Sequence, residues 1–448
     1  MYKNIYFIGI GGIGMSAIAR YYNVKGYNVS GYDKTPSPLT HALEEEGIKV
    51  HYTDDTSYVP SDIDETLVIY TPAIPKDMGE LVYVQEKGYK VIKRSRMLGE
   101  ITQGQRCMAV AGTHGKTTTS TLVSHLFTDS GEGCSAFLGG ISKNYDSNLL
   151  VHDNDVIVAE ADEFDRSFLQ LHPEIAVITS MDADHLDIYG DEAHIHEAFK
   201  AFASQVSGTV IMKHGLDITP EDTAAHIMTY GYDIPEADFY AEPLDDGHFN
   251  LHHPGGVIED CVVGIPGWVN IENGVAASAI ALTYGIAPER IKAALASFGG
   301  VKRRFDMQVE TEGLIYIDDY AHHPNEISAA ISSIRNRYPD YHYTAIFQPH
   351  LYTRTRDFAD EFAAALSDVD RLILLDIYPA REEPIPGVTS QIIFDNVTAP
   401  EKILMSKEEV ADFIKRLPLK EKEVFITLGA GDIDRLTGTI AEILLNKR

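Results

Sequence analysis

A short glycine-rich loop is the part of the sequence best suited to chemistry. It reads Gly112-Thr113-His114-Gly115-Lys116-Thr117, followed by Thr118. The common phosphate-binding loop, G-x-x-x-x-G-K-[ST], would need a glycine at position 110, where this chain has Val110. In such loops the lysine reaches the terminal phosphates and the threonine hydroxyl contacts Mg²⁺. The sequence therefore predicts a shortened nucleotide loop, and a solvated glycine turn is the weaker reading.

A second glycine motif lies near the N-terminus. The stretch Gly9-Ile10-Gly11-Gly12-Ile13-Gly14 matches G-x-G-x-x-G, and Asp33 follows at the end of the next expected strand. This pattern gives a tight turn in which backbone N–H groups and a helix N-terminus approach a diphosphate. Taken alone it suggests a nicotinamide or flavin cofactor, or mere packing of helix on strand. The sequence predicts a diphosphate ligand and leaves its identity open.

Two acidic clusters follow apolar stretches that are typical of buried strands. They are "AEADEFD", with Glu160, Asp162, Glu163 and Asp165, and "MDADHLD", with Asp182, Asp184, His185 and Asp187. Strands of an open α/β sheet place their carboxyl ends at one ligand crevice, where hard oxygen donors suit a Mg²⁺·nucleotide. We expect about two of these side chains to touch metal, as usual coordination numbers allow, and the others to be solvated or to cap helices.

Two further segments combine histidine, tyrosine and arginine after strand-like stretches. They are "DDYAHHPNEI", residues 318–327, and "FQPHLYTRTRDF", residues 347–358. Arginine forks bind carboxylates through two hydrogen bonds, and neighbouring aromatic and histidine side chains suit a small polar ligand. The segments predict a binding site for a small molecule that carries a carboxylate.

The elements that must hold these residues alternate between strand and helix along the chain. Such alternation predicts parallel sheets, and a chain of 448 residues is too long for one core. We expect an α/β protein of three serial domains. These are a Rossmann-like domain over residues 1–104, a P-loop ATPase-type domain over 105–300 with a small β insertion near 230–265, and a Rossmann-like domain over 301–448, with Gly299-Gly300 as a linker.

Composition narrows the possible partners. The net charge of −30, from 67 acidic and 37 basic residues, disfavours binding to nucleic acid. The three cysteines are widely spaced and predict neither a disulfide framework nor a zinc site, which fits a reduced, cytoplasmic setting. No stretch of about 18 apolar residues occurs, so we expect no membrane span.

Taken together, the motifs resemble those of the Mur ligases of bacterial peptidoglycan synthesis. The segments that match, in the family's order, are "GIGGIGMSAIA", "AGTHGKTTT", "AEADEFDRSFL", "MDADHLDIYG", "NIENGVAA", "GVKRRFD", "DDYAHHPNEI", "FQPHLYTRTRDF" and "LGAGDI". The resemblance implies an ATP- and Mg²⁺-dependent, amide-forming ligase. It is strongest to the members that join L-alanine to the carboxylate of UDP-N-acetylmuramate through an acyl phosphate, and it implies no oligomeric state.

The resemblance also implies roles for individual residues. The loop Gly112, Thr113, His114, Gly115, Lys116, Thr117 and Thr118 would hold ATP, with Lys116 also catalytic. Thr117 and Glu160 would bind one Mg²⁺, and His185 would lie on or beside a second. Asn270 and Asn273 would bind adenine, and Arg304 would lie near the nucleotide. The sugar nucleotide would take Gly11, Gly12, Ile13, Gly14 and Asp33, and the amino-acid substrate would face Tyr320, His322 and Arg354. His322 and Arg354 are also candidate catalytic residues, with His322 either handling the amine proton or anchoring the substrate.

Two positions depart from the family pattern, and three other functions stay open at this point. Val269 replaces a usual histidine, and Leu351 replaces a usual arginine, so Arg354 is expected to bind the alanine carboxylate instead. The alternatives are a sister ligase that adds a whole tripeptide during wall recycling, a dinucleotide-dependent oxidoreductase, and a non-catalytic nucleotide-binding regulator. The oxidoreductase would leave the Lys116 loop unexplained.

Overall fold

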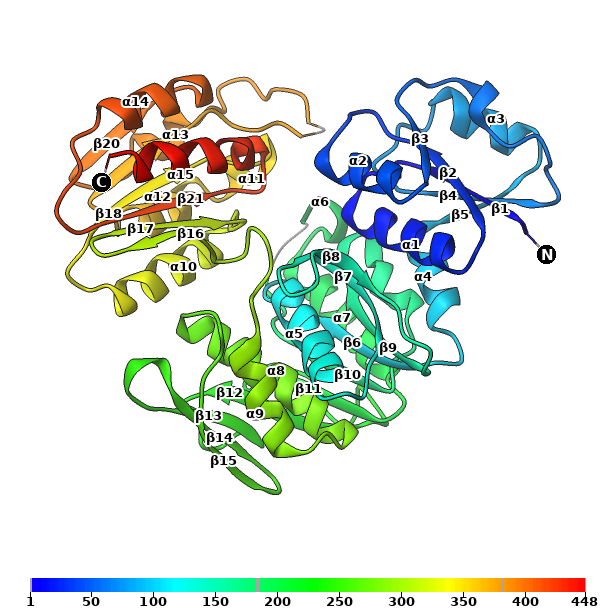
Figure 1. The fold of residues 1–448 in the computed structure, drawn as a ribbon, viewed down its shortest axis with the longest axis horizontal. Helices are drawn as coiled ribbons and strands as arrows, with labels where there is room; N and C mark the ends of the chain where they lie inside the picture. The colour runs from blue at the N-terminus through cyan, green and yellow to red at the C-terminus, as the bar shows by residue number, and fades with distance from the viewer. Residues whose placement is uncertain (1, 183–185, 381, 448) are drawn as a thin grey trace. The chain divides into compact units, whose positions relative to one another are not determined.

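A computed structural model describes residues 2–182, 186–380 and 382–447 (Figure 1). The chain folds into two compact units. The first unit holds Met1–Gly264 with Ile271–Gly299, and the second holds Ile265–Asn270 with Gly300–Arg448. Each unit is built on parallel strands covered by helices, as the alternating sequence predicts. No helix of the described residues is long and apolar enough to cross a membrane.

The N-terminal part of the first unit is a five-stranded parallel sheet of order β3-β2-β1-β4-β5. Its strands are β1 (Asn4–Ile8), β2 (Asn28–Tyr32), β3 (Lys49–His51), β4 (Thr66–Tyr70) and β5 (Lys90–Lys93). Its helices are α1 (Ile13–Val24), α2 (Pro38–Glu45), α3 (Gly79–Glu86) and α4 (Arg94–Thr102). The strand order reverses at β1, so the glycine loop between β1 and α1 lies at the topological switch point where ligands bind.

The rest of the first unit is a ten-stranded sheet of order β15-β14-β13-β12-β11-β10-β6-β9-β7-β8. Its strands are β6 (Arg106–Ala111), β7 (Ser135–Ser142), β8 (Ser147–Leu150), β9 (Val156–Ala161), β10 (Ile175–Ile178), β11 (Thr209–Lys213), β12 (His226–Tyr232), β13 (Phe239–Pro243), β14 (Phe249–His253) and β15 (Gly256–Cys261). Its helices are α5 (Lys116–Asp129), α6 (Leu186–Tyr189), α7 (Glu192–Ser204), α8 (Trp268–Tyr284) and α9 (Pro288–Ser297). The short strands expected near residues 230–265 are present, and they extend this sheet beyond β11.

The two sheets of the first unit share one apolar core. Ile18 of α1 belongs to the same buried cluster as Phe137 of β7, Leu149 of β8 and Ile157 of β9. The ring of Tyr21 lies 5.4 Å from that of Phe137, centroid to centroid. Helix α1 therefore covers its own sheet on one side and the β7–β8 hairpin on the other.

The second unit is a six-stranded sheet of order β16-β17-β21-β18-β19-β20. Its strands are β16 (Asp306–Thr311), β17 (Leu314–Asp319), β18 (His342–Phe347), β19 (Arg371–Leu374), β20 (Glu401–Leu404) and β21 (Glu423–Leu428). Its helices are α10 (Pro324–Arg337), α11 (Tyr352–Asp357), α12 (Ala359–Leu366), α13 (Gln391–Phe394), α14 (Val410–Arg416) and α15 (Thr437–Leu445). The sequence predicted β17, β18, β19 and β21, and it did not predict the edge strands β16 and β20.

Candidate active site

The shortened loop between β6 and α5 needs its glycines for steric reasons. Gly112 has φ +135° and Gly115 has φ +79°, both in the region that favours glycine. A Cβ at position 112 would lie 2.0 Å from Oγ1 of Thr179, and one at 115 would lie 2.9 Å from Oδ1 of Asn273. The loop therefore runs close against neighbouring elements and leads directly into α5, the geometry of a phosphate-binding helix N-terminus.

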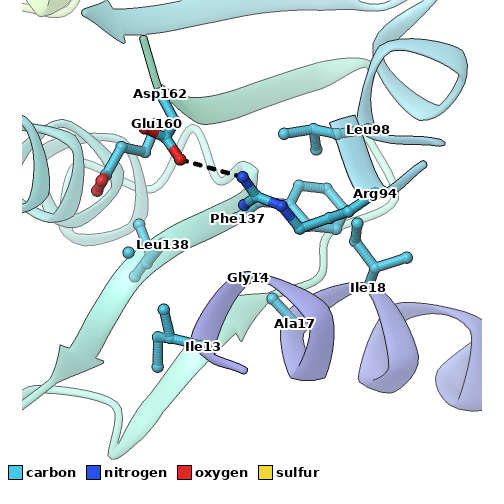
Figure 2. A pocket seen from close by; sticks show the side chains of 11 residues that line it. Ile13, Gly14, Ala17, Ile18, Arg94, Leu98, Phe137, Leu138, Glu160 and Asp162 are labelled. Atoms are coloured by element: carbon cyan, nitrogen blue, oxygen red, sulfur yellow. Dashed lines mark hydrogen bonds and ion pairs between the residues drawn. The ribbon is translucent and has the colours of Figure 1, made fainter. Parts of the chain in front are cut away.

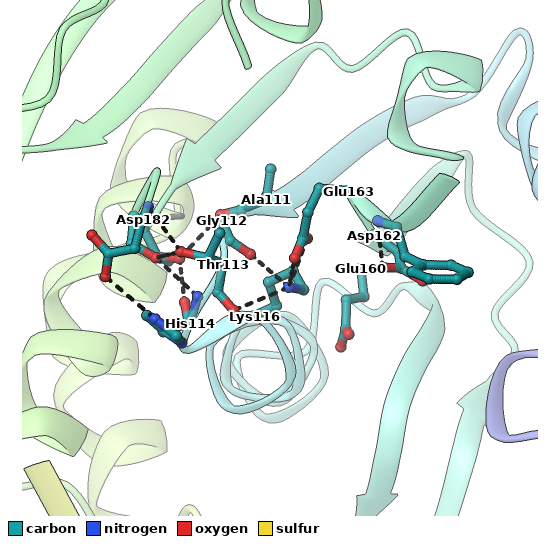
Figure 3. Close-up of polar contacts among 12 residues, drawn as sticks. Ala111, Gly112, Thr113, His114, Lys116, Glu160, Asp162, Glu163 and Asp182 are labelled. Carbon is teal, nitrogen blue, oxygen red and sulfur yellow. Dashed lines mark hydrogen bonds and ion pairs between the residues drawn. The ribbon is translucent and has the colours of Figure 1, made fainter. Parts of the chain in front are cut away.

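Lys116 is held in a polar network at the start of α5 (Figure 3). Its Nζ lies 2.7 Å from Oε2 of Glu163 and donates to the carbonyl oxygen of Gly112 at 2.6 Å. Burial lowers the pKa of Lys116, but the carboxylates of Glu163, Asp162 and Glu160 outweigh that effect and raise the pKa above its usual range. The lysine is therefore a fixed positive charge beside the loop.

The loop is anchored from the carboxyl end of β10 by Ser180, which the sequence analysis did not single out, and by Asp182 of the second acidic cluster. Oγ of Ser180 lies 2.8 Å from Oγ1 of Thr113 and accepts a hydrogen bond from the N–H of His114 at 2.9 Å. Nε2 of His114 lies 3.3 Å from Oδ2 of Asp182. These contacts fix the loop backbone, which is the part that binds phosphate oxygens in such loops.

Thr117 and Glu160, the two described candidates for a metal site, offer hard oxygen donors. Thr117 lies buried in the first turn of α5, and Glu160 is the penultimate residue of β9. A Cβ at Gly139 would lie 2.2 Å from Oε2 of Glu160, so glycine there leaves room for this carboxylate. A hydroxyl and a carboxylate fit Mg²⁺, with water and phosphate oxygens to complete its coordination. His185, the third predicted metal ligand, lies outside the described residues.

In the N-terminal loop, a carboxylate shapes the backbone. Oδ2 of Asp33 accepts a hydrogen bond from the N–H of Gly11 at 2.7 Å. Gly9 has φ +88°, and Gly12 is the N-cap of α1 without a side-chain cap. The first backbone N–H groups of α1 therefore come directly after a glycine turn, which is the arrangement that a diphosphate site requires.

Figure 2 shows a pocket of about 100 Å³ where this loop meets the acidic strand ends. Ile13 and Gly14 of α1 line it together with Glu160 and Asp162. Arg94, at the start of α4, pairs with Asp162 at 3.1 Å, and a Cβ at Gly14 would lie 2.4 Å from its Nη1. The start of α1 and Glu160, the metal-ligand candidate, therefore border one cavity.

The two asparagines expected at adenine lie three positions apart on α8. Oδ1 of Asn273 accepts a hydrogen bond from Oγ1 of Thr119 at 3.2 Å, beside the phosphate loop. Nδ2 of Asn270 donates to the carbonyl oxygen of Pro266 at 2.6 Å. Asn273 thus lies next to the nucleotide loop of the first unit. Asn270, near the start of α8, belongs to the short segment Ile265–Asn270 of the second unit.

The second unit gathers most of its candidate residues at the carboxyl ends of β17 and β18. The ring of Tyr320 lies 5.3 Å from that of His322, and the ring of His322 lies 6.0 Å from that of His350. The guanidinium of Arg304 lies 4.7 Å from the centroid of Tyr320, a cation–π contact. Nδ1 of His322 is 3.0 Å from the carbonyl oxygen of Tyr320, which orients the imidazole.

Arg354 and Leu351 lie on the segment that follows β18. Arg354 is in α11 and is 8 % exposed, while Leu351 precedes the helix with φ +71°, a conformation that costs energy for any residue except glycine. Burial raises the pKa of the nearby Asp319 carboxyl to about 6, against the opposing charge of Arg304. A carboxyl of raised pKa beside arginine, histidine and tyrosine is typical of a functional site.

Comparison with known proteins agrees with this geometry over the whole chain. Three family models match: the Mur ligase family catalytic domain at residues 4–106, the Mur ligase middle domain at 110–281, and the Mur ligase glutamate ligase domain at 303–431. The chain belongs to the Mur ligase family.

Individual Mur ligases resemble the chain from end to end. A UDP-N-acetylmuramate–L-alanine ligase of Parabacteroides distasonis is 52% identical, over 98% of this chain and 97% of that protein. One of Porphyromonas gingivalis is 49% identical, over 99% of both. The crystal structure of a UDP-N-acetylmuramate-alanine ligase from Thermotoga maritima superimposes with a TM-score of 0.84 at 25% identity, over 99% of this chain and 100% of that one.

Membership of the Mur ligase family excludes two of the alternative functions. Mur ligases are ATP-dependent enzymes that form amide bonds, so the chain is an enzyme of this kind, and the oxidoreductase and the non-catalytic regulator are wrong. The three-part α/β fold that the sequence predicts is confirmed. The assignment of roles to single residues, and the boundaries at 104 and 300, stay predictions.

Two residues of this Mur ligase site, Arg94 and Ser180, were not predicted from the sequence. Arg94 follows β5 and Ser180 follows β10, so the rule that ligands collect at strand carboxyl ends was the available signal for both. Glu163 was named only as one acid of a cluster, and its pairing with Lys116 depends on the turn after β9. That turn includes Asp165 and Arg166, which both have positive φ, and no sequence pattern predicts this conformation for them.

Proposed function

We propose that this Mur ligase joins L-alanine to the lactyl carboxylate of UDP-N-acetylmuramate at the expense of ATP, a cytoplasmic step of peptidoglycan synthesis. The observation that carries the proposal is the match, at 49% and 52% identity over nearly whole chains, to ligases named for these two substrates. The presence of two separate phosphate-type loops in the first unit supports it, because the reaction needs a sugar nucleotide and ATP together.

The first chemical step takes place beside the pocket that Gly14, Arg94 and Glu160 line. The Gly9–Gly14 loop and Arg94 hold the diphosphate of the sugar nucleotide, which directs its lactyl carboxylate toward the Gly112–Thr117 loop. The carboxylate oxygen attacks the γ-phosphorus of ATP, ADP leaves, and an acyl phosphate forms. Catalysis of such a transfer comes mostly from positioning and from charge stabilisation.

Lys116 supplies that charge from within the protein. Its partner Glu163 is buried beside it, so the lysine exchanges a carboxylate for phosphate oxygens when ATP arrives. Thr117 and Glu160 would hold Mg²⁺, which neutralises charge on the transferring phosphoryl group. His185 would belong to the same metal environment.

The second step needs the residues of the second unit. Arg354 binds the carboxylate of alanine, and Tyr320 and His322 orient the amino group. The neutral amine attacks the acyl carbon, loses a proton, and phosphate leaves as the amide forms. His322, whose ring lies 5.3 Å from that of Tyr320, is the candidate to take that proton or to anchor the substrate.

The test is ADP release measured with each substrate omitted or replaced in turn. We expect turnover to require UDP-N-acetylmuramate, L-alanine, ATP and Mg²⁺ together, with the peptide product confirmed by mass spectrometry. Preference for a free tripeptide over alanine would identify the recycling ligase instead. Micromolar binding of NADH with no binding of the sugar nucleotide would contradict the assignment of the Gly9–Gly14 loop to the sugar nucleotide.

Metal binding by Glu160 has its own test. Glu160→Ala removes a carboxylate donor, so the concentration of Mg²⁺ needed for half-maximal turnover should rise by tenfold or more and the maximal rate should fall by about 100-fold. Glu197→Ala, on the exposed side of α7, is the control. A Glu160→Ala enzyme with an unchanged Mg²⁺ requirement would exclude this residue from the metal site.

A further inference from the structure

A buried asparagine connects the sugar-nucleotide part of the first unit to its ATP-binding part. Asn148 of β8 is 0 % exposed. Its amide nitrogen donates to the carbonyl oxygen of Ile13 at 2.6 Å and to the hydroxyl oxygen of Ser16 at 2.9 Å. Its amide oxygen accepts from Nη1 of Arg20 at 2.5 Å. One side chain of the central sheet thus contacts three points along α1.

Arg20 is itself fixed from the other side. Its Nε lies 2.9 Å from each carboxylate oxygen of Glu46, which follows α2. Arg20 is 7 % exposed, and the shared apolar core with Phe137 and Leu149 surrounds the contact. Polar groups buried in such a place cost free energy unless they keep their partners, so this arrangement allows little movement of α1 along the hairpin.

The position of Asn148 connects it to the chemistry. Ile13, whose carbonyl it holds, lines the same pocket as Glu160. In the sheet, β8 pairs with β7 and β7 pairs with β9, the strand that carries Glu160 near its carboxyl end. The diphosphate loop is therefore fixed to the sheet that carries the metal-ligand candidate and the ATP loop.

We propose that Asn148 is a positioning residue that sets the distance between the bound sugar nucleotide and ATP. This inference rests on the function proposed above, because it concerns the transfer of phosphate between those two substrates. Asn148 touches neither substrate and acts through the first turn of α1. A displacement of about 1 Å between reacting groups lowers rates by up to about 100-fold, so a small shift of this helix is enough to matter.

The experiment compares Asn148→Ala with Asn154→Ala. The control is matched, because Nδ2 of Asn154 also donates to two backbone carbonyls, of Glu132 and Gly133, but entirely within the central part. For Asn148→Ala we expect kcat to fall by about 10- to 100-fold, while the KM values for ATP and UDP-N-acetylmuramate stay within about threefold of wild type. Asn154→Ala should lower the melting temperature without a comparable loss of kcat.

Two further variants keep the test decisive. Asn148→Asp preserves the acceptor for Arg20 but loses both donated hydrogen bonds, so most of the kcat loss should remain. Ser16→Ala is a milder change that serves if Asn148→Ala does not fold, and it should lower kcat by a few fold with unchanged KM values.

Three results would overturn the proposal: equal kcat losses in Asn148→Ala and Asn154→Ala, wild-type kcat in Asn148→Asp, or a loss confined to KM. If the wild-type enzyme itself fails to join the substrates, the proposed function fails, which is a separate outcome.

Discussion

The two glycine loops of the first unit look alike but use their carboxylates in opposite ways. Both follow a buried parallel strand and open a helix. In the N-terminal loop, Asp33 accepts a backbone N–H of Gly11 and so shapes the turn. In the loop before α5, Glu163 binds the side chain of Lys116 and holds a cation ready.

The difference between the two loops matches a difference in task, because one loop would bind a ligand and the other would catalyse a reaction. A diphosphate that stays intact is held well by backbone dipoles and a helix N-terminus, whose positions do not change. A phosphoryl group in transfer needs positive charge beside the developing negative charge, which Lys116 supplies. We therefore expect changes at the first loop to alter affinity and changes at the second loop to alter turnover.

The largest expected effect is that of Lys116→Ala. Turnover should fall by about 1,000-fold, because the variant loses the positive charge beside the transferring phosphoryl group. Binding of UDP-N-acetylmuramate, measured by calorimetry, should stay within twofold of wild type. Lys200→Ala, which removes an exposed lysine paired with Asp217, is the control and should change neither value. A loss of sugar-nucleotide affinity equal to the loss of turnover would contradict the separation.

Asp33→Ala tests the other side of the comparison. Because a hydrogen bond to a charged group is worth about 1.5–3 kcal/mol, the dissociation constant for UDP-N-acetylmuramate should rise by about tenfold or more. The KM for ATP should not change. Asp33→Asn keeps an oxygen acceptor for Gly11 and should recover part of the affinity. Normal sugar-nucleotide binding by Asp33→Ala would show that the glycine turn holds its shape unaided.

The proposed alanine site of the second unit is a third anion site to compare with the two loops. Arg354→Lys should raise the KM for alanine about tenfold and leave the KM for ATP unchanged, because an ammonium group cannot reproduce the two-pronged contact of a guanidinium with a carboxylate. Leu351→Arg is the control. A φ of +71° is unfavourable for leucine and for arginine alike, so this change should add no backbone strain and should be tolerated. Steady-state kinetics with alanine and ATP varied separately decide the point, and an unaltered alanine constant in Arg354→Lys would remove that residue from the amino-acid site.

The smallest effect concerns the stability of the strand that leads into the first loop. Tyr6 of β1 donates a hydrogen bond to the buried Glu80 at 2.6 Å, and burial raises the pKa of Glu80 from 4.5 to about 7. The native state therefore binds this proton more tightly than the unfolded state, so its stabilisation is present below pH 4.5 and is lost as the pH rises to about 7. The wild-type melting temperature should fall over this interval relative to that of Glu80→Gln. Parallel curves for the two proteins would contradict the raised pKa.

Much of this architecture was predictable because its signals are local. The strands before each loop are apolar runs, and the glycines at 9, 112 and 115 mark positive φ angles that other residues rarely adopt. The edge strands β16 (DMQVET) and β20 (EKIL) were missed because polar residues interrupt their apolar pattern.

The contacts within the site were harder to predict from the sequence. Lys116 pairs with Glu163, 47 positions away, and Ser180 reaches His114 across 66 positions. Such pairs depend on strand order and on the conformation of the turns after the strands. The sequence predicted an acidic cluster at this place, but it could not say which of its acids pairs with Lys116.

The apolar core shared by α1 and the β7–β8 hairpin has a consequence for folding. Phe137, Leu149 and Ile157 lie in the central sheet but are buried against Ile18 of the N-terminal part. A fragment that begins after Gly104 would expose these side chains to water and should aggregate, although it would carry the complete ATP loop. Both parts of the first unit should unfold in one cooperative transition, and a chain nicked at the exposed turn around Gly104 should stay associated through this core.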